Sequence, residues 1–155
     1  MINLIAACSK NGVIGCDGKL PFSIKEDMTF FRKKTTNHTV LMGKKTFESM
    51  GCKALKNRTN VVVSDSYLTQ GLHFENVTII SSKDLYEYVW NFGGYSKDLW
   101  IIGGERLYRE TVPWANRIYL TVVDQIVDVS KHSEVAYFPW IDPTCFSKVE
   151  LEEHL

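Results

Sequence analysis

Short apolar runs alternate with segments of helical periodicity along the chain, and this alternation constrains the fold more than any other feature. The runs are rich in Val and Ile and are bounded by Gly, Asn and Ser, which is typical of buried strands. They predict strands at 2–7, 39–42, 60–64, 77–80, 99–102, 117–123 and 145–151. Strands that alternate with helices favour an α/β layered sheet with helices on both faces.

The segments between these runs predict helices. Ser23 and Glu26 have the spacing of a capping box, and Ile24, Met28 and Phe31 then share one helical face. A short helix is predicted at 44–50, and further apolar stripes lie at 85–92 and 107–112. The chain has 155 residues and no repeat or linker, so we expect a single domain over 1–155.

Charge and cysteine usage argue against several classes of function. The 18 basic and 18 acidic residues give a formal net charge of zero, which leaves no electrostatic footprint for nucleic acid or an anionic membrane. The first apolar run has no basic leader and is too short for a signal peptide or a membrane span, so we expect a cytoplasmic protein. The four cysteines form no Cys-x-x-Cys pair and the four histidines are scattered, so no metal site is predicted.

One carboxylate stands where an apolar residue is expected. Asp27 follows Ile24 by three residues and precedes Phe31 by four, so helical geometry places it on or beside the apolar face. Burial there raises the pKa of a carboxyl group and is costly unless a charged or hydrogen-bonding group meets it. Periodicity alone leaves a second interpretation open, in which Asp27 lies at the edge of the stripe and interacts with the helix dipole.

Two glycine turns are predicted to join strands to helices. Their sequences are Met-Gly-Lys-Lys-Thr at 42–46 and Ile-Gly-Gly-Glu-Arg at 102–106. Glycine lets backbone amides approach a ligand closely, and Lys44, Lys45 and Arg106 would add positive charge for a phosphate. Neither turn matches a P-loop or the Rossmann pattern, so each alone is also compatible with an ordinary turn between a strand and a helix. Two such turns in one small α/β chain favour a dinucleotide ligand.

A further set of motifs follows in order along most of the chain. Asn-Gly-Val-Ile-Gly at 11–15 is followed, four residues later, by Leu-Pro-Phe at 20–22. Thr-Phe-Glu-Ser at 46–49, Arg-Thr-Asn at 58–60, Ile-Gly-Gly at 102–104 with Tyr108, Tyr-Leu-Thr at 119–121 and Phe-Pro at 138–139 come after it. Together with Asp27, these motifs resemble the dihydrofolate reductase family.

The resemblance implies a fold and a reaction. The fold would be dihydrofolate reductase-like, with a mixed, mostly parallel central sheet, helices on both faces, and a C-terminal antiparallel hairpin that we expect to be incomplete here. The reaction would pass a hydride from nicotinamide C4 of NADPH to C6 of 7,8-dihydrofolate while N5 gains a proton, giving tetrahydrofolate. Dihydrofolate and NADPH are the implied ligands, and antifolates such as methotrexate or trimethoprim are expected to bind. We expect a monomer with no nucleic acid or membrane partner.

The family also implies roles for the matching positions. Asp27 would bind the 2-amino group and N3 of the pterin, with Thr121 in support, and Arg58 would take the α-carboxylate of the glutamate tail. The implied catalytic residues are Asp27, Leu20, Phe22 and Tyr108. The implied substrate-binding residues are Ile5, Ala6, Ala7, Asp27, Met28, Phe31, Met50, Arg58, Ile102 and Thr121. The implied cofactor-binding residues are Ala7, Ile14, Gly15, Leu20, Gly43, Lys44, Lys45, Thr46, Ser64, Asp65, Ser66, Ile102, Gly103, Gly104, Glu105, Arg106, Leu107 and Tyr108.

Three features depart from the family pattern. Phe22 replaces the usual tryptophan and removes an indole N–H that helps to hold a water near the pterin. Asp65 stands where the family often has a hydroxyl or basic residue near the 2′-phosphate; nearby basic residues favour NADPH, but NADH is not excluded. The segment 124–139 is longer than usual and has Val-Ala-Tyr at 135–137 where an aspartate commonly steadies the lid at 9–23. The closed lid would be less stable, or Glu134 would hold it.

Two other functions stay open from the sequence. The related pyrimidine reductase of riboflavin synthesis shares the fold and cofactor class, but it needs neither Asp27 nor Arg58. A folate- or nucleotide-binding protein with little or no turnover would keep the pocket, and the expected absence of the last hairpin and the altered lid contacts are what favour it.

Overall fold

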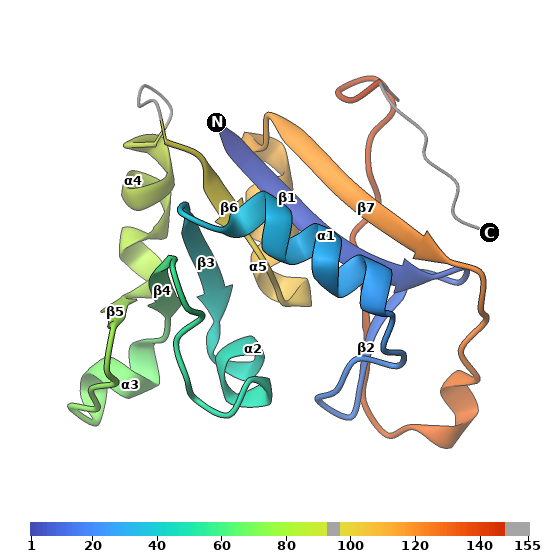
Figure 1. Cartoon of the computed structure of the whole chain (residues 1–155), viewed down its shortest axis with the longest axis horizontal. Helices are drawn as coiled ribbons and strands as arrows, with labels where there is room; N and C mark the ends of the chain where they lie inside the picture. Colours follow the sequence, from blue (N-terminus) through green and yellow to red (C-terminus); the bar gives the residue numbers. More distant parts are fainter. Residues whose placement is uncertain (93–96, 148–155) are drawn as a thin grey trace.

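The computed structural model describes residues 1–92 and 97–147, and a six-stranded sheet forms its centre (Figure 1). The strand order is β5-β4-β3-β6-β1-β7, and the neighbouring strands run parallel. The strands of this sheet are β1 (Ile2–Ser9), β3 (Thr39–Gly43), β4 (Thr59–Val63), β5 (Val77–Ile80), β6 (Leu99–Ile101) and β7 (Arg117–Val123). The α-helices are α1 (Lys25–Thr35), α2 (Lys44–Ser49), α3 (Asp65–Thr69), α4 (Leu85–Trp90) and α5 (Glu105–Thr111). Short 3₁₀ helices are η1 (Ser82–Asp84), η2 (Val112–Trp114) and η3 (Val129–Lys131).

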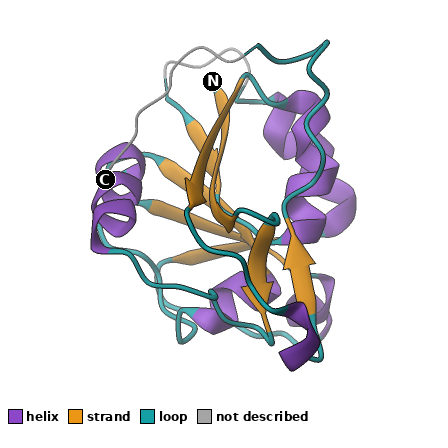
Figure 2. Ribbon diagram, turned by 90° about the vertical axis from the view of Figure 1, so that its right-hand side faces the viewer, coloured by secondary structure: helices purple, strands orange, loops and turns teal. Residues whose placement is uncertain are grey.

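Alternate residues of the buried strands supply two cores, one on each face of the sheet. On one face Leu41, Val61 and Ile101 pack with residues of α4 and α5. On the other face Val40 and Trp100 pack with aromatic residues of α1, α2 and α3. Figure 2 shows helices on both sides of the twisted sheet. The predicted α/β fold with a mostly parallel sheet and helices on both faces is therefore confirmed.

A second, two-stranded sheet lies beside the carboxyl ends of the large one. β2 (Val13–Cys16) pairs antiparallel with β8 (Val135–Tyr137), which comes from the long segment before the Phe-Pro motif (Figure 1). A tight turn follows β2, with Asp17 and Gly18 at φ +49° and +81°. Positive φ at both central residues is what a two-residue hairpin turn requires, and Asp-Gly suits it. The expected lid at 9–23 is thus largely ordered into a strand and a turn.

Several local predictions were wrong. The capping box at Ser23 does not form, because α1 begins after Ile24 and has no side-chain cap; the Ser23 hydroxyl instead approaches the sulfur of Met28. Residues 145–147 of the predicted last strand are not in a strand, and the rest of that prediction lies outside the described residues. None of the helices in residues 1–92 and 97–147 is long and apolar enough to cross a membrane.

Candidate active site

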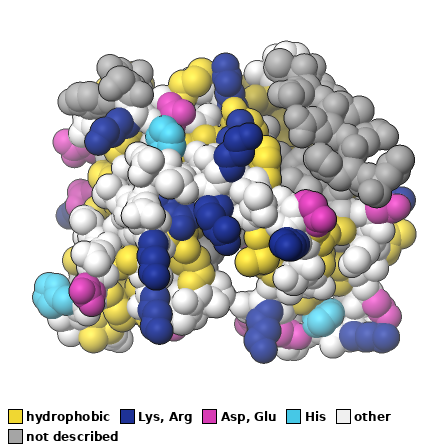
Figure 3. Space-filling model, viewed as in Figure 1, with side chains coloured by type: hydrophobic (Ala, Val, Ile, Leu, Met, Phe, Trp, Pro, Cys, Tyr) yellow, Lys and Arg dark blue, Asp and Glu magenta, His cyan; other side chains and the backbone are white. Residues whose placement is uncertain are grey.

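A cleft of about 1300 Å³ opens at the carboxyl ends of the central strands. It is lined from β1 by Ile5, from β3 by Gly43 and from β4 by Val63, and by the Ile102–Gly104 turn that follows β6. The surface is hollowed between α2 and β2, where this cleft reaches the outside (Figure 3). Ligands of open parallel sheets bind at this edge, in the crevice that forms where the connections from adjacent strands pass to opposite faces of the sheet.

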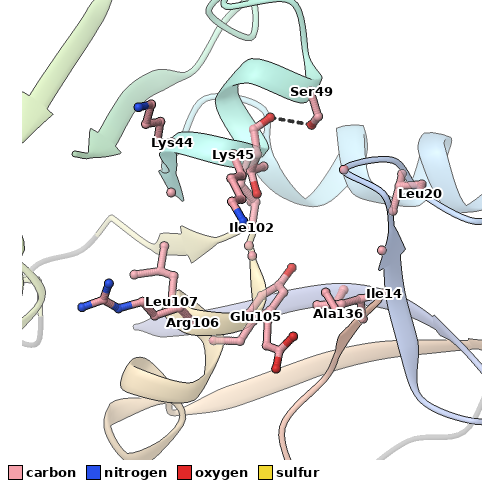
Figure 4. A pocket seen from close by; sticks show the side chains of 18 of the residues that line it. Ile14, Leu20, Lys44, Lys45, Ser49, Ile102, Glu105, Arg106, Leu107 and Ala136 are labelled. Carbon is pink, nitrogen blue, oxygen red and sulfur yellow. Dashed lines mark hydrogen bonds between the residues drawn. The ribbon is translucent and has the colours of Figure 1, made fainter. Parts of the chain in front are cut away.

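The cleft gathers nearly every residue that the sequence assigned to a site. The exceptions are Phe22, which is half-buried outside the lining, and Thr121, which lies behind it on β7. In Figure 4, Ile14, Leu20 and Ala136 lie on the opposite side of the cleft from Lys44 and Arg106, with Ile102 between. Lining residues that the sequence did not assign are Asp17, Gly18, Lys19, Arg32, Ser49, Leu55, Val63, Ser82, Arg109, Glu110, Ser133, Glu134, Val135 and Ala136.

Asp27 is a half-buried carboxyl group in the cleft wall. Burial raises its pKa above the usual aspartate value, and a hydrogen bond with Thr121 acts in the opposite direction. The β1–β7 register explains this contact, because it places Thr121 directly beside Ala7 of the lining. Asp27 shares the lining with its helix neighbours Met28 and Phe31, so this apolar stripe faces the cleft. Asp27 thus lines the cleft, and it also stands among the acidic residues in the first turn of α1, where the second interpretation placed it.

The two glycine turns are hydrogen-bonded to each other in the wall of the cleft. The Gly43 N–H donates to the carbonyl of Gly103 at 2.8 Å, and the Ile102 N–H donates to the carbonyl of Leu41. Gly103 has φ +123°, and a Cβ there would stand 3.3 Å from the Thr46 Oγ1 atom and from the Tyr108 hydroxyl. A side chain at position 103 would be strained by the backbone conformation and would press on both hydroxyl groups. The result is a narrow backbone cradle flanked by the first turns of α2 and α5.

Tyr108 fastens α5 to β1 beneath this cradle. Its hydroxyl donates to the Ile5 carbonyl at 2.6 Å, and the residue is 4% exposed. Burial raises the pKa of Tyr108 well above its ordinary value, and the nearby charge of Asp27 raises it further. The hydroxyl therefore keeps its proton and acts as a donor. Its position next to Gly103 fits the predicted place of Tyr108 beside the cofactor groove.

Polar side chains cluster where β4 passes into α3. Lys44 Nζ donates to Ser66 Oγ at 3.0 Å, and Ser66 Oγ lies 3.2 Å from Ser64 Oγ. Asp65 turns toward Ser82, whose N–H and hydroxyl donate to its two oxygens at 2.8 and 2.6 Å. These bonds lower the pKa of Asp65 below its usual value.

Arg58 lies in another part of the cleft and leaves part of its guanidinium unoccupied. Its Nη1 donates to Thr35 Oγ1 at 3.0 Å and its Nε to the Lys56 carbonyl at 2.9 Å. The guanidinium carbon lies 6.0 Å from the centre of the Phe31 ring. Burial and the charge of Arg32 both lower the pKa of Arg58, although an arginine stays charged at any physiological pH. Arg58 has no carboxylate partner in residues 1–92 and 97–147, so it can receive one from a ligand.

The hairpin turn after β2 is fastened to the segment before β8 by Asp17. One carboxylate oxygen accepts from the N–H groups of Ser133 and Glu134 and from the Ser133 hydroxyl, and the other lies 3.0 Å from His132 Nδ1. These donors lower the pKa of Asp17 to about 2. Glu134 takes part through its backbone, which also accepts from the Asp17 N–H. The Asp-Gly pair at 17–18 is a hairpin signal that could have pointed to this turn from the sequence.

Comparisons with known proteins all point to one family. A family model described as dihydrofolate reductase matches residues 1–155. The dihydrofolate reductase of Bacillus subtilis is 34% identical over 154 residues, which cover 99% of this chain and 84% of that protein. The type 5 dihydrofolate reductase of Escherichia coli is 35% identical over 153 residues, covering 99% and 89%. A solved dihydrofolate reductase from Enterococcus faecalis, complexed with NADP(H) and RAB-propyl, superposes with a TM-score of 0.79 at 31% identity, covering 93% of this chain and 80% of that one.

Proposed function

The chain belongs to the dihydrofolate reductase family, and we propose that it reduces 7,8-dihydrofolate with NADPH as the hydride donor, using Asp27 as the group that assists protonation. Reduction of dihydrofolate to tetrahydrofolate is the reaction of the family and of this chain. The choice of NADPH and the roles of single residues belong to the proposal. The observation that carries it is one cleft that contains both a half-buried carboxyl group and a backbone cradle built from two glycine turns.

Asp27 suits a pterin ring because of where it lies. Ile5, Met28 and Phe31 line the same cleft, and their apolar side chains suit a flat aromatic ligand. The carboxyl group can pair with adjacent N–H groups of the pterin, at the 2-amino group and N3. Because burial raises its pKa, Asp27 holds a proton at higher pH than an exposed aspartate does. In this role it favours protonation at N5, which is the proton half of the reaction.

The glycine turns suit a dinucleotide because only backbone lies at their point of contact. A Cβ at Gly103 would occupy the space next to Thr46 and Tyr108, so the absence of a side chain keeps the cradle open. Lys44, Lys45 and Arg106 line the same part of the cleft and would hold phosphate groups. When bound, NADPH supplies the hydride. The chain's own contribution is to orient the ligands and to exclude water from the reacting atoms.

Arg58 suits the tail of the substrate. Thr35 and the Lys56 carbonyl fix the guanidinium, and its remaining N–H groups can form a bidentate pair with a carboxylate. We assign to it the α-carboxylate of the glutamate tail. Antifolates such as methotrexate or trimethoprim would bind at the Asp27 end of the same cleft.

The decisive experiment follows the decay of nicotinamide absorbance in the presence of dihydrofolate and NADPH. Wild-type protein should show dihydrofolate-dependent oxidation. The Asp27→Asn variant should lose roughly 10²–10⁴-fold in kcat/KM near neutral pH, the usual contribution of acid–base assistance, while it still binds NADPH. Glu26→Gln is the matched control, because it removes an exposed carboxylate from the same helix outside the cleft. Wild-type turnover in Asp27→Asn would show that this carboxyl group is not the one that assists the reaction.

A further inference from the structure

The small sheet of β2 and β8 forms one wall of the cleft. Ile14 and Gly15 of β2 and Ala136 of β8 belong to the lining, and Figure 4 shows Ile14 and Ala136 on the side opposite Lys44. β2 has four residues and β8 only three, and an isolated pair of strands is marginally stable in water. The contacts that β8 makes outside its own sheet therefore decide where this wall stands.

The outer edge of β8 is satisfied by a side chain of α5. Phe138, directly after β8, donates its N–H to the Gly12 carbonyl at 3.0 Å, on the side of β2. Successive N–H groups of an extended chain point to opposite sides, so the Tyr137 N–H points away from β2. It donates to Glu105 Oε2 at 3.0 Å. Glu105 thus accepts from a donor that the edge of a two-stranded sheet would otherwise leave unpaired.

The carboxylate of Glu105 is oriented by its own helix. Glu105 is the first residue of α5, directly after the glycine cradle, and its Oε1 atom accepts from Arg109 Nη2 at 2.6 Å. This ion pair leaves Oε2 for the Tyr137 N–H. The other basic residue of α5, Arg106, pairs with Glu110 at 3.1 Å, so Arg109 is the one that fixes Glu105.

A second contact joins the same two parts of the chain. The centre of the Phe138 ring lies 5.1 Å from that of the Tyr108 ring, in the core cluster that includes α5. This packing does not depend on Glu105. Removing the Glu105 carboxylate should therefore loosen β8 from α5 without unfolding the domain.

We propose that Glu105 is a positioning residue: it fixes β8 against α5 and, through β8, holds Ile14 of β2 in the wall of the cofactor groove. The proposal rests on the proposed function, because it requires that the nicotinamide half of NADPH lie against β2. Without the Glu105 contact, β8 spends part of its time away from α5, and NADPH meets an incomplete wall. The apparent Kd for NADPH then rises as the complete arrangement becomes less populated. Bound NADPH restores that arrangement, so KM changes and kcat does not.

The test compares Glu105→Ala with Glu105→Gln. Both variants lack the negative charge, so its effect on the phosphates of NADPH cancels between them, but only glutamine keeps an oxygen that accepts from the Tyr137 N–H. KM for NADPH at saturating dihydrofolate should be about fivefold higher in Glu105→Ala than in Glu105→Gln, the factor that corresponds to one neutral hydrogen bond. The kcat values of the two variants should agree within about twofold.

Two further measurements separate the positioning role from a general loss of stability. Hydrogen exchange of the Tyr137 amide in the ligand-free protein should be about fivefold faster in Glu105→Ala than in Glu105→Gln. The Phe138 amide, which bonds to Gly12 on the other side, is the internal reference and should exchange alike in both. Adenosine 2′,5′-bisphosphate, which lacks the nicotinamide half, should bind both variants with equal affinity in a calorimetric titration.

The outcomes distinguish this role from the proposed function. Equal KM values for NADPH in the two variants, or equal exchange of the Tyr137 amide, overturn the role of Glu105 and leave the proposed function intact. A loss of affinity in Glu105→Ala that is the same for NADPH and for adenosine 2′,5′-bisphosphate also overturns it, because the effect would then not pass through β8 and β2. Absence of NADPH oxidation in the wild-type protein overturns the proposed function and this role with it.

Discussion

Replacing Tyr108 with phenylalanine removes a single hydroxyl group and leaves the buried ring in place. Just before β1 the Met1 carbonyl accepts from the N–H of Leu99 in β6, and Ile5, four residues later, points its carbonyl to the same side. β6 no longer pairs there, because the ladder between the two strands ends at Leu4 and Ile101. The Tyr108 hydroxyl therefore satisfies a carbonyl that the sheet leaves without a donor. The variant should bury that carbonyl unpaired.

The size of the effect follows from this geometry. A buried acceptor that loses its partner costs about 1–3 kcal/mol, and we take about 1.5 kcal/mol because the phenylalanine ring keeps the packing against Phe138. For a chain of this length, 1 kcal/mol corresponds to roughly 2–4 °C in melting temperature. Tyr108→Phe should thus melt about 3–6 °C below wild type. Its midpoint in urea should fall without a change in the denaturant slope, since the folded shape is retained.

The control for this experiment is Tyr86→Phe. Tyr86 is 56% exposed, and its hydroxyl makes no hydrogen bond within the described part of the chain, so its removal should leave the melting temperature unchanged. Thermal melts followed by circular dichroism measure both variants. A Tyr108→Phe protein that melts within about 1 °C of Tyr86→Phe would refute the reasoning, because it would mean that the Ile5 carbonyl finds another partner.

Three more predictions follow from the cleft. Asp17→Ala should speed tryptic cleavage after Lys19 by about tenfold, because the turn after β2 loses its hydrogen bonds to the segment before β8. Asp128→Ala is the control: it removes hydrogen bonds to Ser130 within that segment and should leave the cleavage rate unchanged. Gly103→Ala should lower the melting temperature and weaken NADPH binding in a calorimetric titration by about tenfold or more, because its Cβ would meet two hydroxyl groups at 3.3 Å. The raised pKa of Asp27 implies that the folded protein binds this proton more tightly than the unfolded chain. The free energy of unfolding of the wild type should therefore decline as the pH rises from the Asp27 pKa of the unfolded chain, about 3.9, to the raised pKa of the folded protein. Thermal melts across that pH range should show this decline in the wild type and not in Asp27→Asn.

The inner strands of the central sheet could be predicted from the sequence because they are buried on both faces, as Thr39–Gly43 and Leu99–Ile101 are. The edge strands Val77–Ile80 and Arg117–Val123 are less buried, and their apolar and β-branched runs match the predicted strands at both ends. The strands β2 and β8 could not be predicted in the same way, since they have only four and three residues and pair across more than a hundred positions. The helix α3 was also missed, although Ser64 is its N-cap and accepts from the Tyr67 N–H. A cap without a long apolar stripe is too weak a signal for a helix of one turn.

In the site, too, residues marked by their sequence neighbours could be predicted, whereas contacts between distant positions could not. Asp27 and the glycine turns are recognisable from neighbours within a few residues, and the fold only had to bring them into one cleft. The partners Ser133 of Asp17 and Ser82 of Asp65 lie 116 and 17 positions away, so nothing local indicates that they would meet these carboxylates. The sequence leaves two alternatives for the closed lid, which would be either less stable or held by Glu134. The structure gives the fastening carboxylate to Asp17, and Glu134 contributes backbone groups.

The three aspartates of the cleft show why one of them is suited to assist a proton transfer. Asp17 and Asp65 each accept several hydrogen bonds from N–H and O–H donors, and such donors stabilise the carboxylate and lower its pKa. Asp27 is more deeply buried and has one hydroxyl partner, so desolvation prevails and its pKa rises. A carboxyl group surrounded by donors can fasten a loop or repel a phosphate, but it holds a proton poorly. The scarcity of donors around Asp27 is therefore a requirement for its proposed role, and a substitution that places an added N–H or O–H donor beside it should lower the pH at which the enzyme loses activity.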